Sequence, residues 1–275
     1  MTFLKCLTVC VMMTFSATCG QQPNVVIIMA DDLGFNDVSF HGSFQIPTPN
    51  IDALAYNGVI LNRFYTAPMC TPSRAALLTG KYPIKTGMQH FVISSDEPWG
   101  LGPDEKIMPQ YFKEAGYSTA LIGKWHLGFF QEQYTPTKRG FDSHFGYLGP
   151  YIDYYDYTYE ETNNNFTGYD MRRNLSVADI NPKPYATELF TNEAVNLIKT
   201  HNYNSSALFL LINHLAPHSG NGGKMQAPQD EIDKFMYIPD IKRRTLAGEY
   251  NRIKELYISN DIFHSNDVSL GSWCW

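Results

Sequence analysis

Three apolar runs along the chain predict the strands of a buried sheet. Residues 24–29 and 207–212 are almost continuously apolar, as expected for strands covered on both faces, and residues 117–123 form a shorter run of the same kind. Polar residues follow each run: an acid pair after the first, Lys124-Trp125-His126 after the second and Asn213-His214 after the third.

Helices are predicted between these strands. Residues 48–57 have a proline in the first turn and a glycine after the last, residues 108–115 stop at a glycine, and residues 187–200 place their apolar side chains on one stripe. Strands that alternate with helices predict an open α/β sheet, whose functional site lies at the carboxyl ends of the strands.

The chain shows no internal repeat and no domain linker. Residues 151–169 are rich in Tyr, Asp and Asn and are interpreted as a long surface loop, although such a segment can also border a pocket.

Residues 1–20 predict a secretory signal peptide. Lys5 supplies an early positive charge, residues 7–15 are mostly apolar and residues 16–20 are small or polar. The apolar run is too short to cross a bilayer, so we expect no stable membrane span. Three Asn-x-Ser/Thr sequons fit a glycosylated protein of the secretory pathway, namely Asn165, Asn174 and Asn204.

Composition and charge narrow the range of partners. The net charge of -6 and the lack of a long Lys/Arg run argue against a nucleic-acid partner, whereas a small anionic substrate stays possible. Removal of the signal would leave Cys70 and Cys274, out of five cysteines, in an oxidising compartment where cysteines are usually paired. Cys70 therefore stands out.

Cys70 opens the most specific motif of the chain, Cys-Thr-Pro-Ser-Arg-Ala-Ala-Leu-Leu-Thr-Gly over residues 70–80. The cysteine comes just before a predicted helix that starts with a proline and closes at a glycine, so it lies at the positive end of the helix dipole, where anions are favoured. A lone cysteine is commonly a buried structural residue, but the flanking pattern outweighs that interpretation.

This motif resembles the signature of the sulfatase family, in which the cysteine is oxidised to formylglycine in the endoplasmic reticulum. A second sulfatase-like element covers residues 116–128, Gly-Tyr-Ser-Thr-Ala-Leu-Ile-Gly-Lys-Trp-His-Leu-Gly. The resemblance extends over residues 23–248 and is greatest to arylsulfatase B and its relatives. Further matches are the acid pair, residues 48–53, Arg139-Gly140-Phe141-Asp142 and His218.

The resemblance implies a fold and an activity. The fold is an alkaline-phosphatase-like α/β/α sandwich with a large mixed sheet, of which this chain holds the N-terminal part. The activity is hydrolysis of sulfate esters in an aryl sulfate or a sulfated carbohydrate, such as the N-acetylgalactosamine 4-sulfate of glycosaminoglycans. The formylglycine-generating enzyme would be a partner during maturation.

The resemblance also implies roles for single residues. The hydrated aldehyde at position 70 is the nucleophile, and Arg74 stabilises its ionised form. Lys124 pairs with a sulfate oxygen, His126 holds a hydroxyl of the diol, and His218 contacts the sulfate or the leaving oxygen. Because one residue separates Lys124 from His126 after a strand, both side chains are expected to point the same way. Trp125 is interpreted as packing and His214 as a neighbour.

A calcium site is expected beside residue 70. Asp31 and Asp32 offer the oxygen ligands that calcium prefers, and the modified residue 70 adds another oxygen. On its own, an Asp-Asp pair would more often be a solvated loop or a helix cap.

The resemblance weakens toward the C-terminal end. Family members continue with an Asp-Asn-Gly element that completes the metal site and then a sulfate-binding lysine, and neither is recognisable here. We expect a chain that is cut short, with a signal peptide (1–20), an incomplete catalytic domain (21–248) and a divergent tail (249–275). Asn260-Asp261, after a strand-like Leu256–Ser259, is a poor substitute. The missing strands are expected to leave a sheet edge exposed.

Two other functions are considered. The chain can be a catalytically inactive product that stays in the secretory pathway or is secreted from it. It can also be a phosphatase or phosphodiesterase of the same superfamily, but these use Ser or Thr as nucleophile, usually with two transition metals, and Cys70 argues against that class. The lysosome and the extracellular space are both open as destinations.

Overall fold

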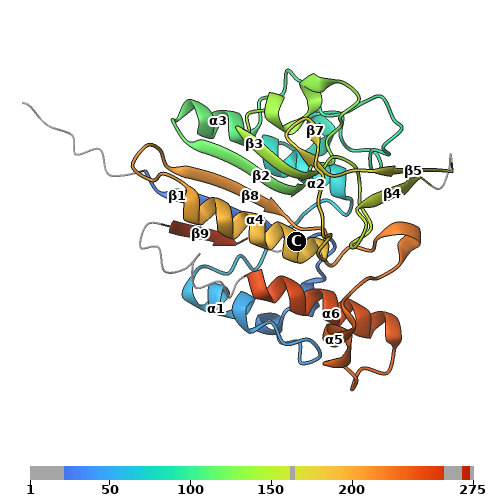
Figure 1. Ribbon diagram of the computed structural model, residues 1–275. Helices are drawn as coiled ribbons and strands as arrows, with labels where there is room; N and C mark the ends of the chain where they lie inside the picture. Colours follow the sequence, from blue (N-terminus) through green and yellow to red (C-terminus); the bar gives the residue numbers. More distant parts are fainter. Residues whose placement is uncertain (1–21, 162–164, 257–267, 273–275) are drawn as a thin grey trace, which may run out of the picture.

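The computed structural model describes residues 22–161, 165–256 and 268–272 (Figure 1). The nine strands of this part are β1 (Asn24–Met29), β2 (Ser118–Lys124), β3 (Ser143–Tyr147), β4 (Thr158–Glu161), β5 (Phe166–Tyr169), β6 (Arg172–Arg173), β7 (Ser176–Val177), β8 (Leu208–Asn213) and β9 (Val268–Ser272). The α-helices are α1 (Pro49–Asn57), α2 (Cys70–Thr79), α3 (Met108–Glu114), α4 (Ala186–Thr200), α5 (Gln229–Asp233) and α6 (Ile241–Leu256).

Seven of these strands form one mixed sheet in the order β7-β6-β3-β2-β8-β1-β9. The pairs β3-β2, β2-β8, β8-β1 and β1-β9 are parallel, whereas β6 and β7 continue the sheet antiparallel beyond β3. β8 thus lies between β1 and β2, which come much earlier in the sequence. Strands β4 and β5 form a separate antiparallel hairpin.

Helices cover both faces of the sheet, which gives three layers (Figure 1). Alternate residues of β1 divide between the two faces: Val26 and Ile28 belong to the core on the α4 side, and Ile27 belongs to the core under α2 and α3. On α4, buried side chains recur at helical spacing, for example Phe190, Ala194 and Ile198. The predicted α/β/α sandwich with a large mixed sheet is confirmed.

The helices and strands predicted from the apolar pattern are confirmed within a residue or two, but the interpretation of residues 151–169 as a solvated surface loop is wrong. This segment contains the β4-β5 hairpin, and Ile152, Tyr154, Tyr157 and Tyr159 are buried. The tyrosine rings can be buried because their hydroxyls find partners: Tyr154 Oη donates to the carbonyl of His218 at 2.7 Å.

The C-terminal region also differs from expectation. Helix α6 runs through position 248, and residues 249–251 are buried. Leu256, predicted to begin a strand, ends this helix, whereas residues 257–267, with Asn260 and Asp261, lie outside the described residues. Strand β9 pairs with β1 along Asn24–Ile28 and is the last strand on that side of the sheet among the described residues, so the expected sheet edge lies at β9.

Two further predictions concern the membrane and the signal peptide. Within the described ranges, none of the helices has the length and apolar character that a membrane crossing requires. The predicted signal peptide lies outside the described residues.

Candidate active site

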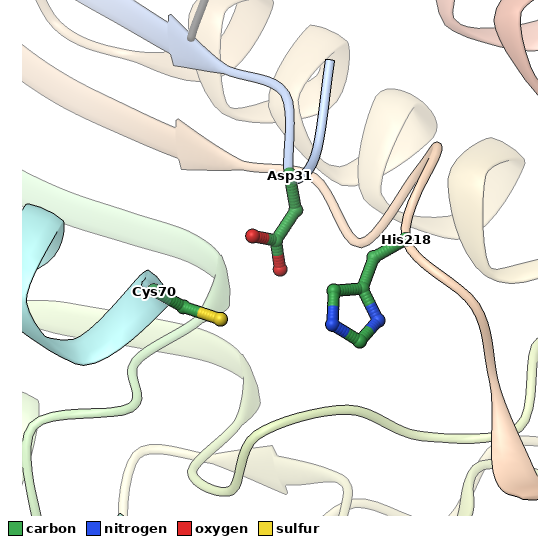
Figure 2. A group of neighbouring side chains, drawn as sticks. All are labelled: Asp31, Cys70 and His218. Atoms are coloured by element: carbon green, nitrogen blue, oxygen red, sulfur yellow. The ribbon is translucent and has the colours of Figure 1, made fainter. Parts of the chain in front are cut away.

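Three functional side chains meet at the carboxyl end of the parallel strands. Asp31 follows β1, His218 lies on the segment after β8, and Cys70 is the first residue of α2 (Figure 2). Cys70 opens the helix itself rather than preceding it, and α2 ends at Gly80, whose left-handed backbone (φ 66°) closes the last turn. One ligand atom from each of the three lies within 4.8 Å of the others.

Asp31 is a buried carboxylate held by two cations. Its side chain is 7% exposed, and its Oδ2 accepts a hydrogen bond of 2.6 Å from Lys124 Nζ and forms an ion pair of 3.5 Å with Arg74 Nη2. Burial alone would raise the pKa of Asp31, but the charges of Lys124 and Arg74 outweigh burial and hold the pKa below its usual value. The acid is therefore ionised at neutral pH.

Lys124 and Arg74 are fixed by more than this carboxylate. Arg74 Nη1 donates to the main-chain oxygen of Lys124 at 3.2 Å, and Asn213 Nδ2 donates to the same oxygen at 2.8 Å. Arg74 Nε is buried without a partner in the described part of the chain, and Nη2 has only its ion pair with Asp31. Buried guanidinium donors of this kind are costly unless an anion satisfies them, so the site is suited to an anionic ligand.

Cys70 and His218 face each other beside Asp31. Burial raises the pKa of Cys70, yet the Lys124 charge and a hydrogen bond with His218 bring it below its ordinary value. Burial lowers the pKa of His218, but the hydrogen bond with Cys70 and the carboxylates of Asp31 and Asp32 raise it overall. The two shifts have one cause in common, because each side chain stabilises the charged form of the other through their hydrogen bond.

His126 is buried behind this group as a neutral imidazole. Burial is the main reason that its pKa lies well below the usual value, and the charges of Lys124 and Arg74 add to the effect. Its Nε2 lies 2.9 Å from the carbonyl of Ile93, which marks Nε2 as the donor and leaves Nδ1 as an acceptor. Nδ1 is buried and has no partner among the residues that the structure describes.

Asp32 does not join the three-residue group. Its backbone is left-handed (φ 64°), and its side chain is 63% exposed at the rim, with Oδ2 3.6 Å from His218 Nε2. Asp31 and Asp32 do line the same pocket, together with Met69, Cys70 and Arg74. The sequence therefore placed both acids at the pocket, but only the first points at Cys70.

The remaining predictions have structural outcomes as well. Trp125 is packing, since it is buried and its Nε1 donates to the carbonyls of Gly128 and Tyr134, both at 3.0 Å. His214 is fully buried, and burial lowers its pKa to about 4. The three sequon asparagines are exposed: Asn165, Asn174 and Asn204.

Two residues of the site were not anticipated. Thr71 links α2 to the neighbouring segments, because its hydroxyl donates to the carbonyl of His126 and accepts from the amide of Ile93, both at 3.2 Å. Tyr147 ends β3 in register with Lys124, and its buried hydroxyl has no partner within the described ranges. The rule that found Lys124, a polar residue at the end of a parallel strand, also applies to Tyr147.

Comparisons with known proteins give a consistent result. Residues 23–221 match the family profile described as Sulfatase. The chain is 41% identical over 235 residues to "Arylsulfatase J" of Mus musculus, which covers 85% of this chain and 38% of that protein. It is 34% identical over 215 residues to "N-acetylgalactosamine-6-sulfatase" of the same species, covering 71% and 40%.

Solved structures agree with the sequence comparisons. The crystal structure of Ps i-CgsB is 30% identical, with a TM-score of 0.78 over 92% of this chain and 58% of that chain. The PsFucS1 sulfatase from Pseudoalteromonas sp., at 24% identity and a TM-score of 0.70, shows the fold. This chain thus spans about two fifths of the length of the curated relatives named above.

Proposed function

Since the chain belongs to the sulfatase family, we propose that it carries the nucleophile-bearing half of a sulfuric ester hydrolase. The observation that carries this proposal is the position of Cys70 at the first turn of α2, within reach of Asp31 and His218 and beside two buried cations. A helix N-terminus and two cations favour an anionic group at this place.

The reaction proposed here depends on modification of Cys70 to formylglycine. As a hydrated aldehyde, this residue supplies one hydroxyl that attacks sulfur and releases the alcohol, and a second hydroxyl whose deprotonation later expels sulfate. The Arg74 guanidinium, whose Nε has no partner among the described residues, would stabilise the ionised diol. His126 Nδ1, a buried free acceptor, would receive a hydrogen bond from one of its hydroxyls.

The positions of Lys124 and His218 support the remaining roles. Lys124 Nζ is buried beside Asp31 and would bind a sulfate oxygen once the carboxylate is shared with a cation. His218 carries a raised pKa and would protonate the leaving oxygen. Lys124 approaches residue 70 from the end of β2, and His218 approaches it from the segment after β8.

Calcium is the cation that we propose for this site. Asp31, Asp32 and the oxygen of a modified residue 70 would hold it, and the ion pairs of Asp31 with Lys124 and Arg74 are both formed through Oδ2. The ion would lower the pKa of the diol. These groups supply fewer than the six to eight oxygens that calcium takes, so we propose that the others come from water or from sequence beyond this half.

We propose a sulfated glycosaminoglycan sugar as the substrate, with N-acetylgalactosamine 4-sulfate as the first candidate. Support comes from two relatives: one is named N-acetylgalactosamine-6-sulfatase, and Ps i-CgsB was solved in complex with k-i-k-neocarrahexaose. Because that relative is named for the 6-position, both sulfate positions need to be tested.

We also propose maturation through the secretory pathway to the lysosome or the extracellular space. The signal peptide at 1–20 and three exposed sequons support this route. The division at position 248 stays a proposal too, although α6 continues through it.

A catalytically inactive product is the second candidate function. It is favoured by one feature of the described residues, namely that Asp31, Asp32 and residue 70 supply fewer oxygens than the six to eight that calcium takes. On this alternative, the chain would fold and bind without turnover.

The test is hydrolysis of a chromogenic aryl sulfate by the 275-residue chain, expressed in cells that make formylglycine. Mass spectrometry of the peptide around residue 70 measures conversion, and Cys70→Ala serves as the inactive control. Lys124→Ala is matched with Lys85→Ala, an exposed lysine. We expect turnover that is lost at positions 70 and 124 and retained at position 85.

The other outcomes separate the alternatives. Converted, folded protein without turnover would support the inactive product, and higher activity on the matching aryl phosphate would reject the sulfatase assignment. Release of sulfate from 4-sulfated or from 6-sulfated N-acetylgalactosamine would then decide the position.

A further inference from the structure

Asp31, Cys70 and His218 present three different ligand atoms to one point. An oxygen, a sulfur and a nitrogen lie within 4.8 Å of one another, on side chains that point into a common space (Figure 2). Ligand atoms on a tetrahedral zinc ion, at bond lengths of about 2.0 to 2.3 Å, are roughly 3.5 Å apart. Movements of about 1 Å would therefore close the group around a single ion.

We propose that the chain with an unmodified Cys70 thiol is a zinc-binding protein, with Asp31, Cys70 and His218 as its three protein ligands and a water molecule as the fourth. Binding replaces water ligands of the hydrated ion by the Asp31 oxygen, the Cys70 sulfur and His218 Nε2, leaves one water in place, and releases the thiol proton to solvent, so that no group is oxidised or reduced.

The contacts of the three residues leave suitable ligand atoms available. His218 Nδ1 lies 2.6 Å from the carbonyl of Ser219, so in the neutral ring this nitrogen carries the proton and Nε2 offers its lone pair to the metal. The ring also stacks on Tyr151, with centroids 5.9 Å apart, which fixes its plane. On Asp31, the ion pairs with Lys124 and Arg74 are both formed through Oδ2, and we propose Oδ1 as the zinc ligand.

The ligand set selects the metal. Thiolate and imidazole suit zinc, whereas calcium takes oxygen ligands alone. The carboxylate and the thiolate together neutralise the ion, and the nearby Lys124 and Arg74 limit its affinity without removing a ligand.

The site has a consequence that rests on the proposed function. Conversion of Cys70 to formylglycine removes the sulfur, so the converted chain would lose this zinc site. Zinc content would then report the unconverted fraction of a preparation.

The test uses the full chain produced in cells without the converting activity, with the thiol verified by mass spectrometry. The metal-free protein is titrated with Co²⁺, which gives a sulfur-to-metal charge-transfer band when a thiolate binds, and Zn²⁺ is then added as competitor. The substitutions Cys70→Ser and His218→Ala remove ligands. Their matched controls are Cys274→Ser and His90→Ala, the latter an exposed histidine.

We expect one Zn²⁺ per chain and a charge-transfer band that Zn²⁺ abolishes. Loss of either ligand should weaken binding by at least about 100-fold, the upper end of the effect of losing a partner outside the coordination shell. The controls should bind like the parent. Circular dichroism verifies that each variant is folded. Cys70→Ser and His218→Ala each test the site separately, so the test does not depend on both variants folding.

Binding that persists in Cys70→Ser, a cobalt spectrum without the sulfur band, or loss of the band in Cys274→Ser would each overturn the proposal. None of these results depends on sulfate hydrolysis. Failure of the zinc site and failure of the sulfatase assignment are therefore separate outcomes.

Discussion

Replacing Glu249 by Gln tests whether a buried carboxyl on α6 is kept in its neutral form. Glu249 is fully buried, its Oε1 accepts a hydrogen bond from the amide of Gln226, and its Oε2 has no partner in the part of the chain that the structure describes. Burial raises its pKa from 4.5 to about 9. Glutamine has the shape of the protonated acid and never ionises.

The magnitude follows from linkage between protonation and folding. Because the folded-state pKa is raised, the folded chain keeps a proton that the unfolded chain releases above pH 4.5. The stabilisation of the folded state by protonated Glu249 is fully present below pH 4.5. It is lost as pH rises toward the folded-state pKa near 9, at about 1.4 kcal/mol of the free energy of unfolding per pH unit. At pH 7 the native protein should have lost about 3 kcal/mol of its free energy of unfolding through this group.

The assay is urea unfolding of the native chain and Glu249→Gln at several pH values from 5 to 8. We expect the stability of the variant relative to the native chain to rise steadily with pH over this range. Glu160→Gln, at an exposed glutamate, is the matched control and should show no such trend. A difference between native chain and Glu249→Gln that stays constant from pH 5 to 8 would refute the reasoning.

Three further substitutions test the fold. Gly123→Ala should prevent folding, since the new Cβ would lie 1.9 Å from a backbone oxygen of the neighbouring strand. Gly80→Ala has open space around it and should lower the free energy of unfolding, measured by thermal unfolding, by about 1 to 2 kcal/mol. Tyr250→Phe should lower the free energy of unfolding, measured by urea titration, by about 1 to 3 kcal/mol. The Tyr250 hydroxyl accepts a hydrogen bond from the amide of Gly34 and donates one to the carboxylate of Asp37, at 3.0 Å each. The control Tyr237→Phe, at an exposed tyrosine, should have less effect. Phe190→Ala should cost about 3 to 5 kcal/mol by the same measurement, since its ring is fully buried under the sheet; a cost under about 1 kcal/mol would contradict the assigned core.

The sequence predicted the central strands because burial on both faces leaves a continuous apolar run. Residues 24–29 and 207–212 show such a run, and the structure has β1 and β8 there. β3, with the sequence Ser-His-Phe-Gly-Tyr, was not predicted, because its polar residues and glycine hide the pattern. Strand order was also out of reach, since the position of β8 between β1 and β2 depends on packing of segments far apart in the chain.

The convergence of the site was predictable from the rule that polar residues gather at strand ends. Asp31, Lys124 and His218 follow this rule, and the motif around Cys70 added the helix N-terminus. The separation of Asp32 from its neighbour was not predictable, because it comes from one left-handed backbone angle. The buried tyrosines after Gly149 were misread as solvated, since a sequence does not show which hydroxyls will find acceptors.

The place of β8 in the sheet also determines when the site can form during synthesis of the chain. β1 and β2 do not pair with each other, and each pairs with β8, which ends at Asn213. A growing chain therefore cannot bring Asp31 beside Lys124 until the ribosome has added roughly 140 residues after Cys70, which takes about 7 to 30 s at 5 to 20 residues per second. During that interval Cys70 lies on a segment without its final neighbours, whereas in the finished fold it is partly buried beside Asp31 and His218.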